Sequence, residues 1–137
     1  MNERMSIVAD TVVLEESPIK ASWIVSGSPR TRMRMLSVSE DKVSSAFAWD
    51  CTAGVFDWYY YADETIHVIQ GEATLTLDGT HRTITAGDLV YIAGGTIVRW
   101  EVADYIRKVA FLRQQMPQPA ALALRLFNRA RYRKYLP

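Results

Sequence analysis

Two glycine-punctuated stretches, ETIHVIQG at residues 64–71 and TAGDLVYIAGG at residues 85–95, decide how this chain folds. Each contains a short run rich in β-branched and apolar residues that ends at glycine, a pattern typical of short strands joined by sharp turns. Between them, Asp78-Gly79 separates TLTL from THRTI. A two-residue loop of this type needs positive φ at both positions, so it predicts an antiparallel hairpin.

The same pattern extends outward from these stretches, from Ala21 to Arg113, with turn formers at intervals typical of sandwiches and barrels. The sequence therefore predicts an all-β domain. The expected strands are Ser22–Ser26, Arg32–Val38, Val43–Trp49, Val55–Tyr61, Thr65–Ile69, Ala73–Leu77, His81–Ile84, Leu89–Ile92, Ile97–Val102 and Ile106–Leu112.

Composition predicts one domain, because 137 residues with 49% hydrophobic content can bury a single core. No apolar run approaches the ~18–20 residues of a membrane span, and the first residues, MNER, do not begin a secretory signal. We therefore expect a cytoplasmic protein without a membrane span. Cys51 is the only cysteine, which excludes an intrachain disulfide, and we expect it to be buried and inert.

Charge is distributed unevenly along the chain. Residues 1–104 contain eight basic and fifteen acidic side chains, whereas residues 105–137 contain eight basic and no acidic ones. After Met116-Pro117, residues 120–130 are mostly strong helix formers, which predicts a C-terminal helix. Arg125, Arg129 and Arg133 would form one basic ridge. The expected organisation is an N-terminal arm (1–20), a barrel (21–116) and a basic C-terminal helix (117–137).

That helix has two interpretations. It could pack on the barrel or on a second subunit with its charges in water, or it could offer a basic surface to acidic membranes or nucleic acid. No nucleic-acid motif accompanies it, so we expect no nucleic-acid partner.

Further motifs, WDCTAGVFDWYY at 49–60, WEV at 100–102 and IRKVAF at 106–111, complete a resemblance. Together with the first two stretches, they resemble the branch of small cupins related to (S)-ureidoglycine aminohydrolase and ethanolamine-utilization cupins. The resemblance covers roughly residues 20–113. It implies a double-stranded β-helix, the cupin or RmlC-like jelly roll, commonly a homodimer with its pocket inside the barrel. It implies no particular activity, since many members of this branch have no assigned reaction.

The cupin pattern also implies a metal held by three histidines and a glutamate. In this chain those positions are Trp58, Tyr60, Val98 and Glu64, so only the glutamate is retained. The Glu-x-His-x3-His pattern of ureidoglycine aminohydrolases would fall on Trp58, Tyr60 and Glu64 and is absent too. One carboxylate binds a transition metal poorly, so we expect neither a metal nor another cofactor. By strand alternation His67 faces away from Glu64 and is expected to be structural, although a pocket or ligand role stays open, and His81 is expected to be exposed.

Strand alternation points one set of side chains into the expected barrel. The candidate ligand-binding residues are Phe56, Trp58, Tyr60, Glu64, Val98 and Trp100. Glu64 and Tyr60 are also the candidate catalytic residues, as general base and hydrogen-bond donor.

The favoured interpretation of these residues is an uncharacterised cupin that binds a small polar or cationic metabolite, because a carboxylate beside aromatic faces suits an organic cation. The alternative is an enzyme acting on ureide-like or other small nitrogen compounds, with Glu64 as general base or metal ligand. A barrel filled only by its own side chains, and an interaction protein using its basic helix, also stay open. Whether any reaction is catalysed is undecided by the sequence.

Overall fold

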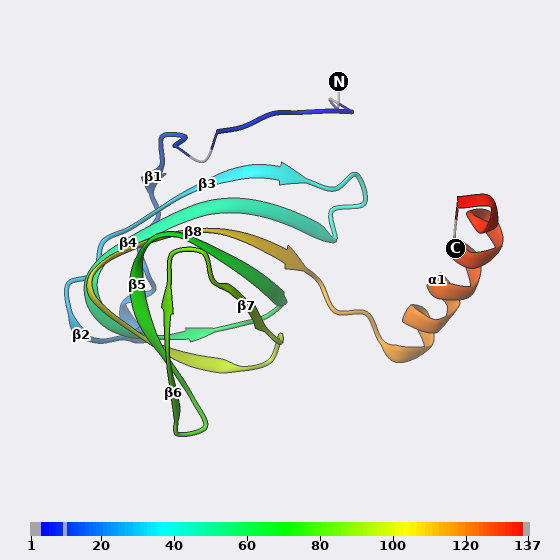
Figure 1. Cartoon of the computed structure of the whole chain (residues 1–137). Helices are drawn as coiled ribbons and strands as arrows, with labels where there is room; N and C mark the ends of the chain where they lie inside the picture. Colours follow the sequence, from blue (N-terminus) through cyan, green and yellow to red (C-terminus); the bar gives the residue numbers. More distant parts are fainter. Residues whose placement is uncertain (1–3, 10, 136–137) are drawn as a thin grey trace.

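The computed structural model describes residues 4–9 and 11–135. Figure 1 shows an antiparallel β-barrel followed by one helix that stands apart from it. The elements in chain order are β1 (Glu15–Glu16), η1 (Ala21–Trp23), β2 (Ile24–Gly27), β3 (Thr31–Val38), β4 (Ser44–Tyr59), β5 (Asp63–Leu77), β6 (Thr80–Thr85), β7 (Leu89–Ile92), β8 (Ile97–Arg113), α1 (Gln118–Arg131) and η2 (Arg133–Tyr135). The expected all-β jelly roll with a C-terminal helix is confirmed.

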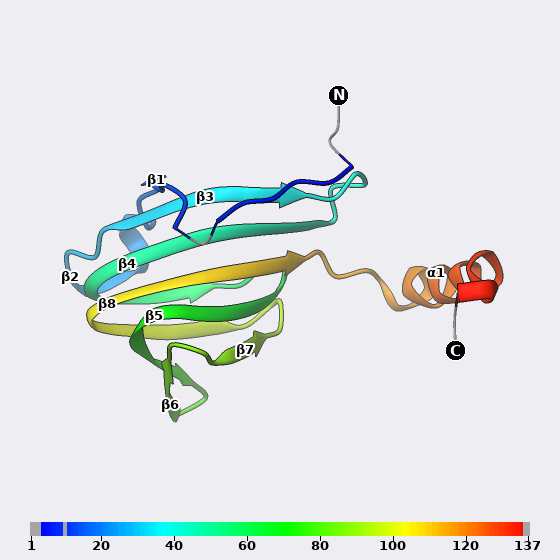
Figure 2. The ribbon, with the colours of Figure 1, turned by 45° about the horizontal axis from the view of Figure 1, so that its top comes forward.

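Three long strands, β4, β5 and β8, form the centre of the sheet, in the order β1-β3-β4-β8-β5-β6. The first half of β5 pairs with β7 and its second half with β6, while β4 pairs with β3 and then with β2. These strands therefore run through two facing layers, which Figure 2 shows along their edges. The barrel interior is the space between the layers.

Six of the expected strands were divided wrongly, because each pair of them is one continuous strand. Residues 43–61 contain β4, residues 65–77 belong to β5, and residues 97–112 belong to β8. The pairing shifts register near Gly54 and Gly71, so the chain bends there and the ladder then resumes. The first expected strand is also shifted, since residues 21–23 form a 3₁₀ turn ahead of β2.

The hairpin expected at Asp78-Gly79 is confirmed. Leu77 pairs with Thr80, and the two loop residues have φ of 49° and 77°. Both values are positive, as a type I′ turn requires. This turn fixes β6 against the second half of β5, so that the inward-facing residues of both strands line one end of the barrel.

The N-terminal arm runs over β3 and β4 on the outside of the barrel (Figure 2). Its side chains Leu14 and Ile19 are buried, and β1 pairs with β3. Arg34 and Arg107 each donate a hydrogen bond to a carbonyl of this arm, at Val13 and Val12. These two bonds, together with the β1–β3 pairing, hold the arm against the barrel.

The C-terminal helix α1 has no buried residue among those described. It follows the connection 114–117 away from the barrel in both views (Figures 1 and 2). Its apolar side chains, such as Leu126 and Phe127, are more than half exposed. Neither α1 nor η2 is long and apolar enough to span a bilayer.

Candidate functional site

The residues predicted to face inward come together inside the barrel. Phe56 and Trp58 on β4 pair with Trp100 and Val98 on β8, so the four side chains form two neighbouring cross-strand pairs. Tyr60 follows β4, and Glu64 is the second residue of β5. Trp58 is half-buried, whereas the other predicted site residues are buried.

Aromatic rings fill this part of the barrel. Phe56 stacks on Trp100 with 6.1 Å between centroids and 7° between planes, and Trp49 meets Trp100 edge-on at 5.8 Å. Trp58 packs edge-on against Phe56. The indole Nε1 of Trp100 donates a hydrogen bond of 3.0 Å to the Tyr60 hydroxyl. The polar edges of the two rings therefore satisfy each other without water.

Lys108 of β8 is the residue at this site that sequence reasoning missed. Its Nζ donates a hydrogen bond of 3.1 Å to Oε2 of Glu64, and the two side chains are only 6% and 4% exposed. The same nitrogen lies 4.6 Å from the ring centroid of Trp49 and 4.8 Å from that of Trp100. A signal existed, because Lys108 alternates with Ile106 and Ala110 on a strand whose inward positions are buried.

This contact changes how Glu64 can act. Its carboxylate is neutralised by a buried ammonium, and the faces of Trp49 and Trp100 that would attract an organic cation already hold that ammonium. A general base must also be within hydrogen-bond reach of its substrate, and Glu64 is only 3% exposed, so a substrate would have to reach it inside the barrel. Burial, with the nearby Glu64 charge, raises the pKa of Tyr60 well above its usual value, so its hydroxyl stays protonated.

The residues at this site do not fit a metal. Trp58, Tyr60 and Val98 stand at the three histidine positions, and one Glu64 oxygen is bound by the Lys108 ammonium. Within the described ranges, 4–9 and 11–135, no group of three or more His, Cys, Asp or Glu side chains could hold a metal ion. Protein metal sites usually need three or four such ligands.

The remaining predicted residues lie outside this cluster. His67 is exposed on the outer face, as alternation predicts, and His81 is exposed with its ring nitrogen 2.7 Å from the Thr76 hydroxyl. Cys51 is buried, as expected. Burial raises the pKa of its thiol to about 12, so it is not a reactive nucleophile near neutral pH.

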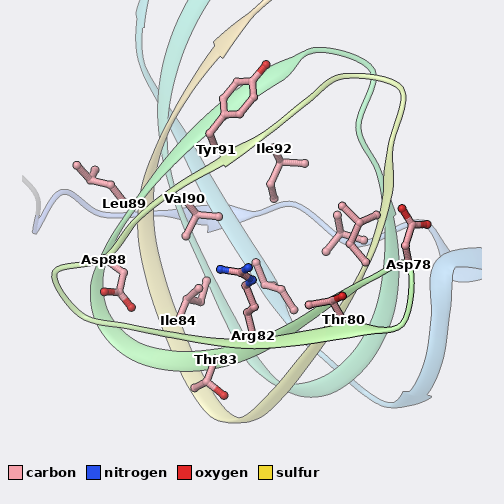
Figure 3. A pocket seen from close by; sticks show the side chains of 13 residues that line it. Asp78, Thr80, Arg82, Thr83, Ile84, Asp88, Leu89, Val90, Tyr91 and Ile92 are labelled. Carbon is pink, nitrogen blue, oxygen red and sulfur yellow. The ribbon is translucent and has the colours of Figure 1, made fainter.

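A pocket of about 670 Å³ opens beside the aromatic cluster, between β6 and β7. Its floor is apolar, and Figure 3 shows Val90 and Ile92 pointing into it while Leu89 and Tyr91 point away. The guanidinium of Arg82 lies near its centre (Figure 3). The lining residues are Leu75, Leu77, Asp78, Thr80, Arg82, Thr83, Ile84, Asp88, Leu89, Val90, Tyr91, Ile92 and Val98.

The pocket and the cluster share a wall. Of the predicted site residues, Val98 lines the pocket itself. Glu64 and Trp100 are the cross-strand partners of Ile92 and Leu75, which also line it. Val98 thus lines the pocket, while Glu64 and Trp100 lie beside lining residues on the same inward-facing side of the sheet.

Arg82 is the second residue that sequence reasoning missed. Within the part of the chain that the structure describes, it makes no hydrogen bond or ion pair. Arg82 itself is exposed, although it shares the inward-facing register of the buried Ile84, and a lone arginine among threonines gives no other signal. Of the groups that line the pocket, the guanidinium of Arg82 is the one that would bind an anion most strongly.

The comparisons with known proteins fit this fold. A solved structure of a DUF861-family protein of unknown function from Pseudomonas syringae pv. tomato is 25% identical, with a TM-score of 0.71 over 77% of this chain and 46% of that one. The EutQ protein of Clostridium difficile is 23% identical, with a TM-score of 0.56 over 63% of this chain and 64% of that one.

Sequence comparison leads to the same group. A curated relative named acetate kinase EutQ, from Clostridioides difficile, is 35% identical over 52 residues, which are 38% of this chain and 33% of the relative. The match thus spans a third of that relative. Residues 38–110, more than half of this chain, match the family described as the EutQ-like cupin domain. The chain therefore belongs to the EutQ-like cupin family.

Proposed function

We propose that this protein binds a small organic anion with an apolar body in the pocket between β6 and β7. The observation that carries the proposal is Arg82, an exposed guanidinium that has no hydrogen-bond or ion-pair partner among the described residues and lies above a floor of Ile84, Val90 and Ile92. The expected class of ligand, a small polar metabolite, is kept. The sequence favoured a polar or cationic metabolite; we propose an anion, because Lys108 already occupies the aromatic cage that would attract a cation.

The chemistry of the pocket favours a monocarboxylate. A guanidinium fork pairs bidentately with a carboxylate, and an apolar tail would gain about 25 cal/mol for each Å² that it buries on the floor. Asp78 and Asp88 lie on the rim, where a second or third negative charge on the ligand would meet repulsion. We therefore expect monocarboxylates to bind better than phosphates or nucleotides.

The name of the curated relative also supports a negatively charged ligand. Acetate is a carboxylate, although the match covers a third of that protein. A volume of about 670 Å³ lies in the range of pockets for larger ligands, so acetate alone would fill little of it. A longer or branched carboxylate suits the space better.

Calorimetric titration with acetate, butyrate and hexanoate, each compared with the amine and alcohol of the same chain length, tests the proposal. Affinity should rise with carboxylate chain length, and the amines and alcohols should bind at least tenfold more weakly. Arg82→Gln should abolish this preference, Arg82→Lys should keep part of it, and Arg125→Gln on α1 should match the wild type. Equal binding to wild type and Arg82→Gln, or no binding by any acid, would reject the proposal.

We also propose that the protein is a homodimer, as its family resemblance implies. The outer face of β5, β7 and β8 supports this, because exposed Leu89, Tyr91 and Phe111 gather there. The partner in this proposal is a second copy of the chain. A light-scattering test of this face is described in the Discussion.

A further inference from the structure

The cluster around Lys108 has the composition of a binding site for an ammonium ion. Such ions are held by a carboxylate together with the faces of aromatic rings. Here Glu64 supplies the carboxylate, and Trp49 and Trp100 supply the rings at 4.6 and 4.8 Å from Nζ, with Phe47 at 5.9 Å. The occupant is the chain's own side chain.

We infer that Lys108 is a tethered cation that fills an ammonium site inside the barrel, and that shortening its side chain turns the vacated space into a receptor for free primary alkylammonium ions. The site lies outside the pocket of Arg82 and takes the opposite charge. The inference is therefore independent of the proposed function.

The tether is fixed by the fold. Lys108 pairs with Trp49 on one side and with Val68 on the other, so β4 and β5 hold its backbone in place. Its side chain points to the same interior as Ile106 and Ala110, which are completely buried. Removing the side chain would leave Glu64 and the rings in position, because the substitution does not alter the backbone pairing of the strands that carry them.

The site selects an organic ammonium over a metal ion. One carboxylate and several ring faces suit a primary ammonium, which has three N–H donors and a small alkyl stem. A divalent metal needs further nitrogen, oxygen or sulfur ligands, and the surroundings are rings and aliphatic side chains. An alcohol of the same size lacks the charge that the buried carboxylate requires.

Lys108→Ala provides the test, because the atoms that it deletes beyond Cβ correspond to n-propylammonium. Melting followed by near-UV circular dichroism reports the aromatic cluster directly. The variant should melt roughly 10 °C or more below the wild type, because it leaves Glu64 unpaired. At about 100 mM, n-propylammonium chloride should restore roughly 5 °C in a saturable manner.

Three solutes and three proteins serve as controls for the site. Sodium chloride at equal ionic strength, 1-propanol and MgCl₂ should restore nothing, and the wild type and Lys20→Ala should not respond to the amine. The double variant Glu64→Gln with Lys108→Ala should lose the response, since the carboxylate is gone. If Lys108→Ala does not fold alone, recovery of its native spectrum on adding n-propylammonium becomes the readout. A variant that gains no more from the amine than from sodium chloride overturns the inference.

Discussion

The ammonium nitrogen of Lys108 lies 3.1 Å from a carboxylate oxygen of Glu64, with both side chains buried among aromatic rings. Desolvating two charges is costly, so such a pair adds little to stability compared with an apolar pair. Removing one partner costs much more, because the other charge then remains buried alone. The pair therefore couples β5 to β8 at the centre of the barrel.

Glu64→Gln and Lys108→Met should each lower the free energy of unfolding by about 3–5 kcal/mol. The double variant should lose clearly less than the sum of the two, since neither charge is then left alone. Urea unfolding at neutral pH measures all four proteins, and Lys20→Met, at an exposed lysine, should stay within about 0.5 kcal/mol of the wild type. Additive single losses would contradict the coupling.

A second buried carboxylate, Asp50, lies on the outer face of the same layer. Arg32 Nε donates to it at 3.0 Å and the Tyr105 hydroxyl at 2.8 Å. Burial alone would raise the pKa of Asp50, but these hydrogen bonds and the charge of Arg32 outweigh it and hold the pKa below the usual value. The folded state therefore favours the ionised form.

The sign of the pH dependence follows from that direction. A carboxylate with a depressed folded pKa stabilises the protein above its unfolded pKa of about 3.9, and this stability is lost as pH falls through the folded pKa. Asp50→Asn should thus be less stable by about 1–3 kcal/mol at pH 7 and should lose less than the wild type between pH 5 and 2.

Asp57 gives the matched comparison for Asp50. It pairs with Arg99, its pKa is also lowered by that hydrogen bond, and its side chain is 30% exposed against 2% for Asp50. Asp57→Asn should therefore change stability by less than about 1 kcal/mol. Urea midpoints across the acid range measure both variants, and an unchanged acid slope in Asp50→Asn would refute this role for Asp50.

Local signals in the sequence predicted much of the fold. The Asp78-Gly79 turn fixed one hairpin, and strand alternation correctly placed Phe56, Trp100 and Glu64 inside. The continuity of β4, β5 and β8 was missed, because glycine usually marks the end of a strand. In this barrel Gly54 and Gly71 instead mark bends within a strand.

The candidate site was harder to predict, for a physical reason. A lysine on a strand is usually solvated, so only the pairing of β8 with β5 shows that Lys108 reaches Glu64. Similarly, Arg82 becomes notable only when β6 and β7 form an open apolar pocket beside it. Both contacts join segments distant in the sequence, which local patterns do not record.

Gly71 and Gly79 have the same φ of 77° but different surroundings. Replacing each by alanine therefore distinguishes the cost of the backbone conformation from the cost of a steric clash. A Cβ on Gly71 would collide with the carbonyl oxygen of Tyr105 on β8, whereas a Cβ on Gly79 would meet nothing within 4 Å. Gly79→Ala should cost about 1–2 kcal/mol, the cost of the left-handed conformation alone. Gly71→Ala should lose a further 1–3 kcal/mol or so, because β8 must move. Equal urea midpoints for the two variants would contradict this difference.

The proposed dimer face lies across three adjacent strands. Thr65 of β5 pairs with Tyr91 of β7 and with Phe111 of β8, so these side chains share one outer surface. Tyr91 and Phe111 are 64% and 52% exposed, and Leu89 opposite His67 is 73% exposed. A twofold axis through such a face would place the same uncharged patch against itself.

Light scattering coupled to size exclusion at micromolar concentration should give twice the chain mass of 15.6 kDa for the wild type. Tyr91→Glu and Phe111→Glu should each shift the mass toward one chain, because a charge would be buried against its own copy without a partner. Val25→Glu, at an exposed position on β2, should leave the mass unchanged. Each variant should keep the near-UV spectrum of the barrel core, which separates loss of assembly from loss of folding. A wild type with the mass of one chain would contradict the dimer, and glutamate variants that keep the doubled mass would show that this face is not its interface.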